Sequence, residues 1–390
     1  MSHKSDRRRT ALIAGLCLAA SLVGCTPFEP AAAPEETDSA QLSFPLSLPE
    51  AAPQWNRAYQ HALRDRLKTL AQRDDATSQL DIVRLQPLLD GCYTAALPTD
   101  VRRERARALG RAQALADPDD DTAFWYEAAI CARIESFAEN RCDPDSALAH
   151  LQRSDPENAA VWLMTAEAAS ARGDRAGVDA ALSQAAKARR YDIRYGASAI
   201  PTMRALERLD LPALDAQALT VLDSSGQLAD ANLKDARTAL AGWAFVLPSP
   251  LVFQRSCRAA AADTADTAAQ RRTDCIATAT LLAGSDTLIG RMFGLALMAE
   301  LTANTAGGAA WRERMRILHW QSTQISAHPA LSRDLERAWR EGEVVTLVAR
   351  LKHAGLDRPS SDWLPENPRT RALILSGIPL PDTATGQPET

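Results

Sequence analysis

Apolar residues recur at helical spacing along most of this chain. From Trp55 to about Ala354 they stand three and four positions apart, and no segment sustains the alternation that is typical of strands. Trp55, Tyr59, Leu63 and Leu67, for example, fall on one face of a first predicted helix. The pattern therefore predicts an all-α fold.

Further helices follow from the same spacing. They are predicted around residues 80–89 and over 101–116, 232–246, 251–262, 264–283, 285–303, 309–326 and 332–341. The segment 285–303 is the most apolar of these and is expected to be the central helix of a second helical unit. Two prolines, Pro201 and Pro212, shorten the segments after residue 195. We therefore predict a first helical domain over 54–195, a second unit over 196–357 and a Pro-rich, partly disordered tail over 358–390.

One 34-residue segment, AAVWLMTAEAASARGDRAGVDAALSQAAKARRYD at 159–192, resembles a tetratricopeptide (TPR) repeat. Matching residues occupy the aromatic position of the first helix, the small position at the helix crossing, the turn, and the large and small positions of the second helix: Trp162, Ala166, Gly173, Asp174, Leu182 and Ala185. Ala169, Val178 and Arg190 depart from the usual Tyr, Ala and Pro. A degenerate repeat begins near Trp125, so the first domain is expected to be a TPR-like solenoid of helical hairpins.

The TPR resemblance implies a surface for a partner. Stacked helical hairpins bind extended peptides or partner helices on a concave face. On the first helix of the repeat this face is predicted to present Trp162, Glu167, Ala169 and Arg172, with Glu167 exposed; Trp162 has core packing as an equal alternative.

The N-terminus has the form of a secretory signal. Basic residues, Lys4 and 7–9, precede an apolar run over 11–23 that is too short to cross a hydrocarbon core of about 30 Å. The run ends in Leu-Val-Gly-Cys, which resembles the lipobox of bacterial lipoproteins and implies that Cys25 is lipidated and begins the mature chain. Thr26, where that family's inner-membrane signal is usually Asp, suggests the outer membrane. Residues 1–24 are thus a predicted signal peptide, and Pro/Ala-rich 25–53 a tether.

The remaining cysteines and the charge narrow the class of protein. Cys257 and Cys275 lie on consecutive predicted helices and are the favoured disulfide pair, and one more pair is expected among Cys92, Cys131 and Cys142. The chain has a net charge of −5, which argues against nucleic acid as a partner.

Signals for catalysis or metal binding are weak. Glu135 followed by Ser resembles the catalytic Glu-Ser of lytic transglycosylases, but their Gly-Leu-Met-Gln-like motif does not follow. The acidic stretch 117–127 resembles a calcium loop, yet Thr122 stands where glycine is needed, so Asp121 is better interpreted as a helix cap. The histidines lack metal-ligand spacing. Trp311, Trp320 and Trp339 either form a binding groove or, as we favour, pack in the core. No metal and no cofactor are predicted.

Together these patterns predict a lipid-anchored protein on the periplasmic face of the outer membrane. We expect a non-catalytic scaffold or assembly factor for envelope proteins. The alternative is a murein-acting enzyme that uses Glu135 as its acid.

Overall fold

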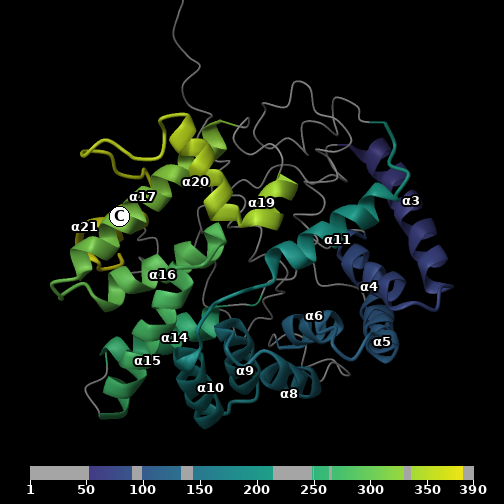
Figure 1. Ribbon diagram of the computed structural model, residues 1–390, viewed down its shortest axis with the longest axis horizontal. Coiled ribbons are helices and arrows are strands. Elements are labelled where there is room, and N and C mark those ends of the chain that lie inside the picture. Colours follow the sequence, from purple (N-terminus) through teal and green to yellow (C-terminus); the bar gives the residue numbers. More distant parts are fainter. Residues whose placement is uncertain are drawn as a thin grey trace, which may run out of the picture.

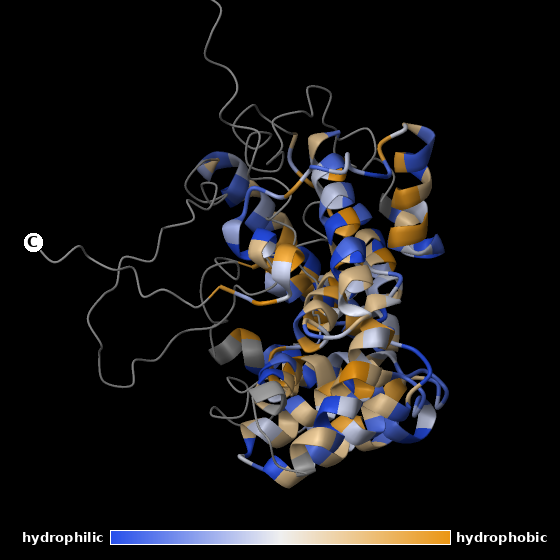
Figure 2. Cartoon of the chain, turned by 90° about the vertical axis from the view of Figure 1, so that its left-hand side faces the viewer, coloured by the Kyte–Doolittle hydropathy of each residue, from blue (hydrophilic) through white to orange (hydrophobic). Residues whose placement is uncertain are grey.

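The structure of this chain, a computed structural model, describes residues 52–89, 99–132, 144–213, 248, 250–262, 266–328 and 335–380. Helices make up most of these residues, and they contain no β-strand (Figure 1). The predicted all-α class is confirmed. Polar and apolar residues both occur along the same helices, as amphipathic helices that bury one face require (Figure 2).

The N-terminal helices form one core with helix α11. They are α3 (Pro53–Ala71), α4 (Ala76–Leu85), the short 3-10 helix η1 (Gln86–Leu88) and α5 (Thr99–Leu115). The predicted face of α3 is buried, with Tyr59 and Leu63 fully inaccessible. Helix α4 begins where the Asp75 carboxylate accepts the Ser78 N–H at 2.8 Å. α11 (Tyr195–Glu207) packs against α4 and supplies Met203 and Leu206 to this core.

The TPR-like segment forms a helical hairpin, as its pattern predicts. Helix α9 (Ala159–Ala171) and helix α10 (Arg175–Lys187) pack along each other, and Ala166, Leu182 and Ala185 are buried between them. Gly173 has a φ of 72°, which glycine adopts readily, and Asp174 caps α10 through the Gly177 N–H at 2.9 Å. Upstream, α6 (Thr122–Cys131) and α8 (Pro144–Ser154) pack as a second helix pair against α9.

The next pair of helices packs directly on this hairpin. Helix α14 (Leu251–Ala262) lies against α9, and α15 (Asp266–Ala283) lies against α10. α16 (Leu288–Leu301) then packs on α15 and α14, and α17 (Gly308–Ala327) packs on α16. A single apolar cluster runs from Trp125 on α6 to Leu301 on α16. One core therefore joins helices from both sides of residue 195.

Three short helices complete the described chain. They are α19 (Leu335–Glu341), α20 (Glu343–His353) and α21 (Pro368–Ser376). α19 packs on α11, where Trp339 joins the N-terminal core, and α20 and α21 pack on α17. Helix α21 lies within the predicted tail, and its Leu373 and Ile374 are buried against α16 and α17. Part of the segment predicted to be a partly disordered tail is therefore an ordered helix, although Leu375 and Ile378 next to the buried pair are exposed.

Candidate functional site

Two of the four predicted groove residues are buried. Glu167 is 6% exposed and Ala169 is 2% exposed. Helix α14 packs on the side of α9 that carries Glu167, whereas the Ala169 side chain lies close to Gly177 of α10. The Glu167 carboxylate accepts the backbone N–H of Val252, at the start of α14, at 3.4 Å. The expectation that Glu167 is exposed is therefore wrong: a helix of the same chain occupies the face where a partner was expected.

The other two groove residues make local contacts. Trp162 is half-buried, and its Nε1–H donates to the Pro156 carbonyl oxygen at 2.8 Å. Arg172 is exposed at the end of α9, and its guanidinium lies 2.7 Å from the Asp145 carboxylate of α8. The predicted groove residues are therefore not presented together: Glu167 and Ala169 are buried, Trp162 contacts the loop before α9, and Arg172 is paired at the surface.

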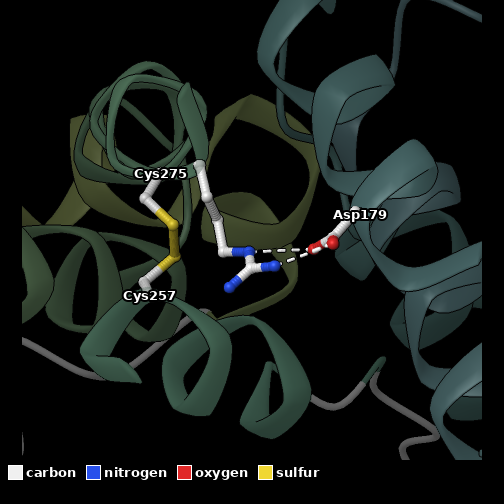
Figure 3. The surroundings of a disulfide bond; sticks show 4 residues. Asp179, Cys257 and Cys275 are labelled. Carbon is white, nitrogen blue, oxygen red and sulfur yellow. Dashed lines mark hydrogen bonds and ion pairs between the residues drawn. A yellow bond between two sulfur atoms is a disulfide. The ribbon is translucent and has the colours of Figure 1, made fainter. Parts of the chain in front are cut away.

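The helix pair that covers α9 is held in two ways. Cys257 of α14 and Cys275 of α15 form a disulfide, as predicted (Figure 3). Beside it, the Arg271 guanidinium of α15 makes two hydrogen bonds, at 2.8 and 2.7 Å, to the Asp179 carboxylate of α10 (Figure 3). Cys131 is also disulfide-bonded, to a partner outside the described residues.

A network of charged side chains ties the first hairpins to the start of α11. Asp121, before α6, lies 2.7 Å from His150 Nε2, 2.9 Å from Ser154 Oγ and 3.2 Å from the Arg194 guanidinium. Arg194 also reaches the Asp155 carboxylate at 3.2 Å. Its guanidinium lies over the Trp125 ring, 5.0 Å from the ring centre.

Backbone groups extend this network toward the second unit. Asn158, fully buried before α9, donates to the Asp192 carbonyl at 2.9 Å and accepts the Asp192 N–H at 3.0 Å. Arg190 donates to the Asp155 carboxylate at 2.5 Å. Arg194 has a φ of 52°, which is uncommon for a residue with a side chain, and it directly precedes α11. Loop 190–194 therefore fixes the direction in which the chain enters α11.

The network is suited to holding helices together rather than to catalysis. His150 and Ser154 bind different oxygens of Asp121, so the histidine is not placed to remove the serine proton. Burial raises the pKa of Asp121, but hydrogen bonds from His150, Ser154 and Arg194 outweigh it and hold the pKa below its usual value. The prediction that the Asp121 side chain caps α6 is wrong, because this side chain makes no hydrogen bond to the start of the helix. Instead, the Thr122 N–H donates to Asp120 Oδ1 at 2.9 Å.

A second unusual group lies where α20 meets α16. The Glu343 carboxylate, at the start of α20, accepts the Leu288 N–H of α16 at 2.8 Å. The Val344 N–H donates to the Asp286 carbonyl at 2.8 Å, so two hydrogen bonds join these segments. Tyr195, at the start of α11, lies close enough for the Glu343 charge to affect its phenol.

The carboxyl groups at this junction resist ionisation. Burial, with the nearby Asp286 carboxylate, raises the pKa of Glu343 to about 7, although the Leu288 N–H opposes the shift. Burial and the Asp192 carboxylate likewise raise the pKa of Asp286. Arg291 faces Asp286 and lowers that pKa in part, while its own side chain binds the Ser285 carbonyl at 2.5 Å. The result is a junction whose charge changes near neutral pH.

The tryptophans of the C-terminal unit make three separate contacts. Trp339 is 6% exposed and packs edge-on against Tyr195. Trp320 donates to the Leu356 carbonyl at 2.8 Å, and Trp311 lies under the Arg314 guanidinium, 4.4 Å from its ring centre. Core packing, the favoured interpretation, holds for Trp339, whereas Trp311 and Trp320 are only half-buried.

Sequence patterns did not identify Arg194 or Glu343. Arg194 stands in a loop without a motif, and Glu343 resembles any acidic residue in the first turn of a helix. Cys25 and Glu135, the predicted lipidation and alternative catalytic residues, lie outside the described residues.

The described part of the chain contains neither a candidate metal site nor a helix that could span a membrane. There, no three His, Cys, Asp or Glu side chains are grouped so that they could hold a metal ion. In the same residues, no helix combines the length and the apolar character needed to cross a membrane. In comparisons with known proteins, no protein-family model, no curated protein and no solved structure matches this chain.

Proposed function

We propose that this protein is a lipid-anchored, non-catalytic scaffold of the bacterial cell envelope, built as a TPR-like solenoid. Lipidation at Cys25, after the Leu-Val-Gly-Cys motif, would hold it at the periplasmic face of the outer membrane. A helical body whose surface presents many polar side chains, on a tether of about 28 residues, suits a protein that brings envelope proteins together.

The stacking of helix pairs carries this proposal. α6–α8, α9–α10 and α14–α15 pack one on the next around one apolar cluster. Repeat proteins share this arrangement, in which each pair buries its apolar face against its neighbours. Such stacks most often serve to bind other proteins. The ion network at Arg194 and the disulfide both stiffen the stack, which preserves the shape of its outer surface.

Because α14 covers α9, the partner is expected on outward-facing helices. Exposed side chains include Arg175 and Gln184 on α10 and Arg107 on α5. Charged and amide side chains at the surface offer hydrogen bonds that fix a partner's position.

Site-specific photocrosslinking in intact cells tests the scaffold. A photoreactive amino acid would replace Arg175, Gln184 or Arg107, with the exposed Val345 of α20 as a position on a distant helix. A reproducible adduct with one envelope protein, formed from the positions on one helix and not from those on the other helices, would support the proposal. Adducts at all positions with abundant proteins alone would contradict it. Release of soluble murein fragments by the purified protein, lost in Glu135→Gln, would replace it with the enzymatic alternative.

The anchor is tested separately. Cys25→Ser should move the protein from the membrane fraction to the soluble periplasmic fraction and abolish incorporation of labelled palmitate. An unchanged distribution would show that the Leu-Val-Gly-Cys motif is not a lipidation site.

A further inference from the structure

A small cavity opens between α3, α4 and α5, which pack side by side at one edge of the molecule (Figure 1). Its volume is ≈ 140 Å³. Seven residues line it, one at the end of α3, two on α4 and four on α5: Ala71, Gln79, Ile82, Glu104, Arg107, Ala108 and Arg111. The cavity lies apart from the Arg194 network and from the Glu343 junction.

The lining is divided into an apolar floor and a charged rim. Ile82 and Ala108 are 2% and 3% exposed and form the floor with Ala71. Arg107 and Arg111 are exposed and stand four residues apart, so both guanidiniums lie on one face of α5. In the parts of the chain that the structure describes, neither guanidinium has an ion-pair partner.

The charges at the rim favour an anion with a single charge. Arg107 and Arg111 contribute two positive charges and Glu104 one negative charge, so a monoanion would leave the rim neutral. Two guanidiniums offer several N–H donors in a planar arrangement that matches a carboxylate. The ligand must therefore combine one carboxylate with an apolar group.

The size of the cavity limits the apolar group. Apolar cavities of about 150 Å³ hold one benzene molecule, which is close to the volume of a valine or leucine side chain. In a polypeptide, one residue carries both an apolar side chain and a carboxylate only when it is the C-terminal residue. Internal Asp or Glu residues offer the carboxylate without the apolar group.

We propose that this cavity binds the free C-terminus of a partner polypeptide that ends in valine or leucine. The C-terminal carboxylate binds Arg107 and Arg111, and the side chain contacts Ile82 and Ala108. This inference rests on the proposed scaffold function and identifies the kind of segment that the scaffold recognises. The backbone of the partner then leaves the cavity past Glu104.

Binding of short peptides to the purified protein tests the proposal. Isothermal titration would use Gly-Ser-Gly-Ala-Leu with a free carboxylate, the same peptide with an amidated C-terminus, and N-acetyl-leucine. We expect the free peptide to bind and the amide to bind at least tenfold more weakly, because the amide lacks the charge that strengthens the hydrogen bonds from the guanidiniums. A tenfold change in affinity corresponds to about 1.4 kcal/mol.

Three variants locate the binding. Arg107→Gln with Arg111→Gln should weaken binding at least tenfold, and Ala108→Leu, which fills the floor without changing charge, should abolish it. Arg57→Gln, on an exposed residue near the start of α3 and away from the cavity at the other end of that helix, should bind like the wild type. Circular dichroism confirms that each variant is folded, and a reduced affinity counts only for folded protein.

Several results would overturn the proposal. Equal binding of the acid and the amide would exclude carboxylate recognition, and binding of N-acetyl-leucine without the peptide would assign the cavity to a small metabolite acid. Equal loss in Arg57→Gln would show general attraction to positive charge. No binding at millimolar peptide would reject the proposal, whereas the photocrosslinking result at α10 would still decide the scaffold function independently.

Discussion

Protonation of Glu343 should control the stability of the contact between α20 and α16. The carboxyl group keeps its proton up to about pH 7, compared with an ordinary pKa of 4.5. Folding raises the pKa of this carboxyl group, so the folded state holds the proton more tightly than the unfolded state. Its contribution to stability is therefore fully present below about pH 4.5, where the group is protonated in the folded and the unfolded state alike. This contribution is lost as the pH rises through about 7, where the folded carboxyl group ionises.

The size of the effect follows from the shift. One pKa unit corresponds to about 1.4 kcal/mol, so the shift from 4.5 to about 7 has an upper limit of about 3.4 kcal/mol. Glu343 retains some contact with solvent, and its ionised form keeps the Leu288 N–H as a donor. We therefore expect a loss of roughly 1–2 kcal/mol in the free energy of unfolding between pH 5 and pH 8.

Urea unfolding, followed by tryptophan fluorescence at several pH values, measures this loss. Glu343→Gln removes the ionisation and keeps an oxygen acceptor for the Leu288 N–H. Its stability relative to the wild type should therefore rise by roughly 1–2 kcal/mol from pH 5 to pH 8. The matched control is Glu341→Gln, whose carboxylate is exposed and paired with Arg337. A difference between wild type and Glu343→Gln that stays constant over this range would refute the reasoning.

Three further predictions concern packing and capping, and all are measured by urea unfolding at pH 7. Arg194→Ala removes two ion pairs, to the half-buried Asp121 carboxylate and the buried Asp155 carboxylate, and should cost about 2–3 kcal/mol. Arg172→Ala, at an exposed pair, should cost under about 1 kcal/mol. Equal losses would contradict the special role of Arg194. Gly294→Ala places a methyl group 2.1 Å from the Ala283 nitrogen and should cost about 1–3 kcal/mol. Gly110→Ala, whose new methyl group meets no atom within 4 Å, should stabilise α5 by about 0.5–1 kcal/mol. The opposite order would show that packing between α15 and α16 is loose. Glu167→Ala removes a carboxylate from the start of α14 and should cost about 1–2 kcal/mol, with a smaller loss in Glu167→Gln; no loss would mean that α14 does not depend on this contact.

The hairpin and many of the described helices could be read from the sequence because they depend on local spacing. The exceptions are α11, which runs through Pro201 instead of being shortened by it, and α20 and α21, which were not predicted. Helix α14 has the predicted bounds of 251–262, and the turn at Gly173 follows from one glycine and one capping aspartate. The disulfide could be predicted for the same reason, because two consecutive helices that form a hairpin bring Cys257 and Cys275 close together.

The candidate site could not be read in the same way because it depends on contacts between distant segments. Glu167 has the pattern of an exposed residue on a repeat helix, yet it is buried by α14, 85 residues further along the chain. Asp121 resembles a local cap, but its partners come from α8 and from the loop before α11. Local spacing carries no information about which later helix will cover a given face.

The position of α14 on α9 also has a consequence in time. A ribosome adds about 5–20 residues per second, so the 85 residues between Glu167 and Val252 take about 4–17 s to synthesise. During that interval the α9–α10 hairpin exists without the helix that covers it. A nascent or prematurely ended chain therefore exposes the apolar face of the α9–α10 hairpin that α14 and α15 later cover. Chaperone binding should be strongest for chains that stop before residue 251.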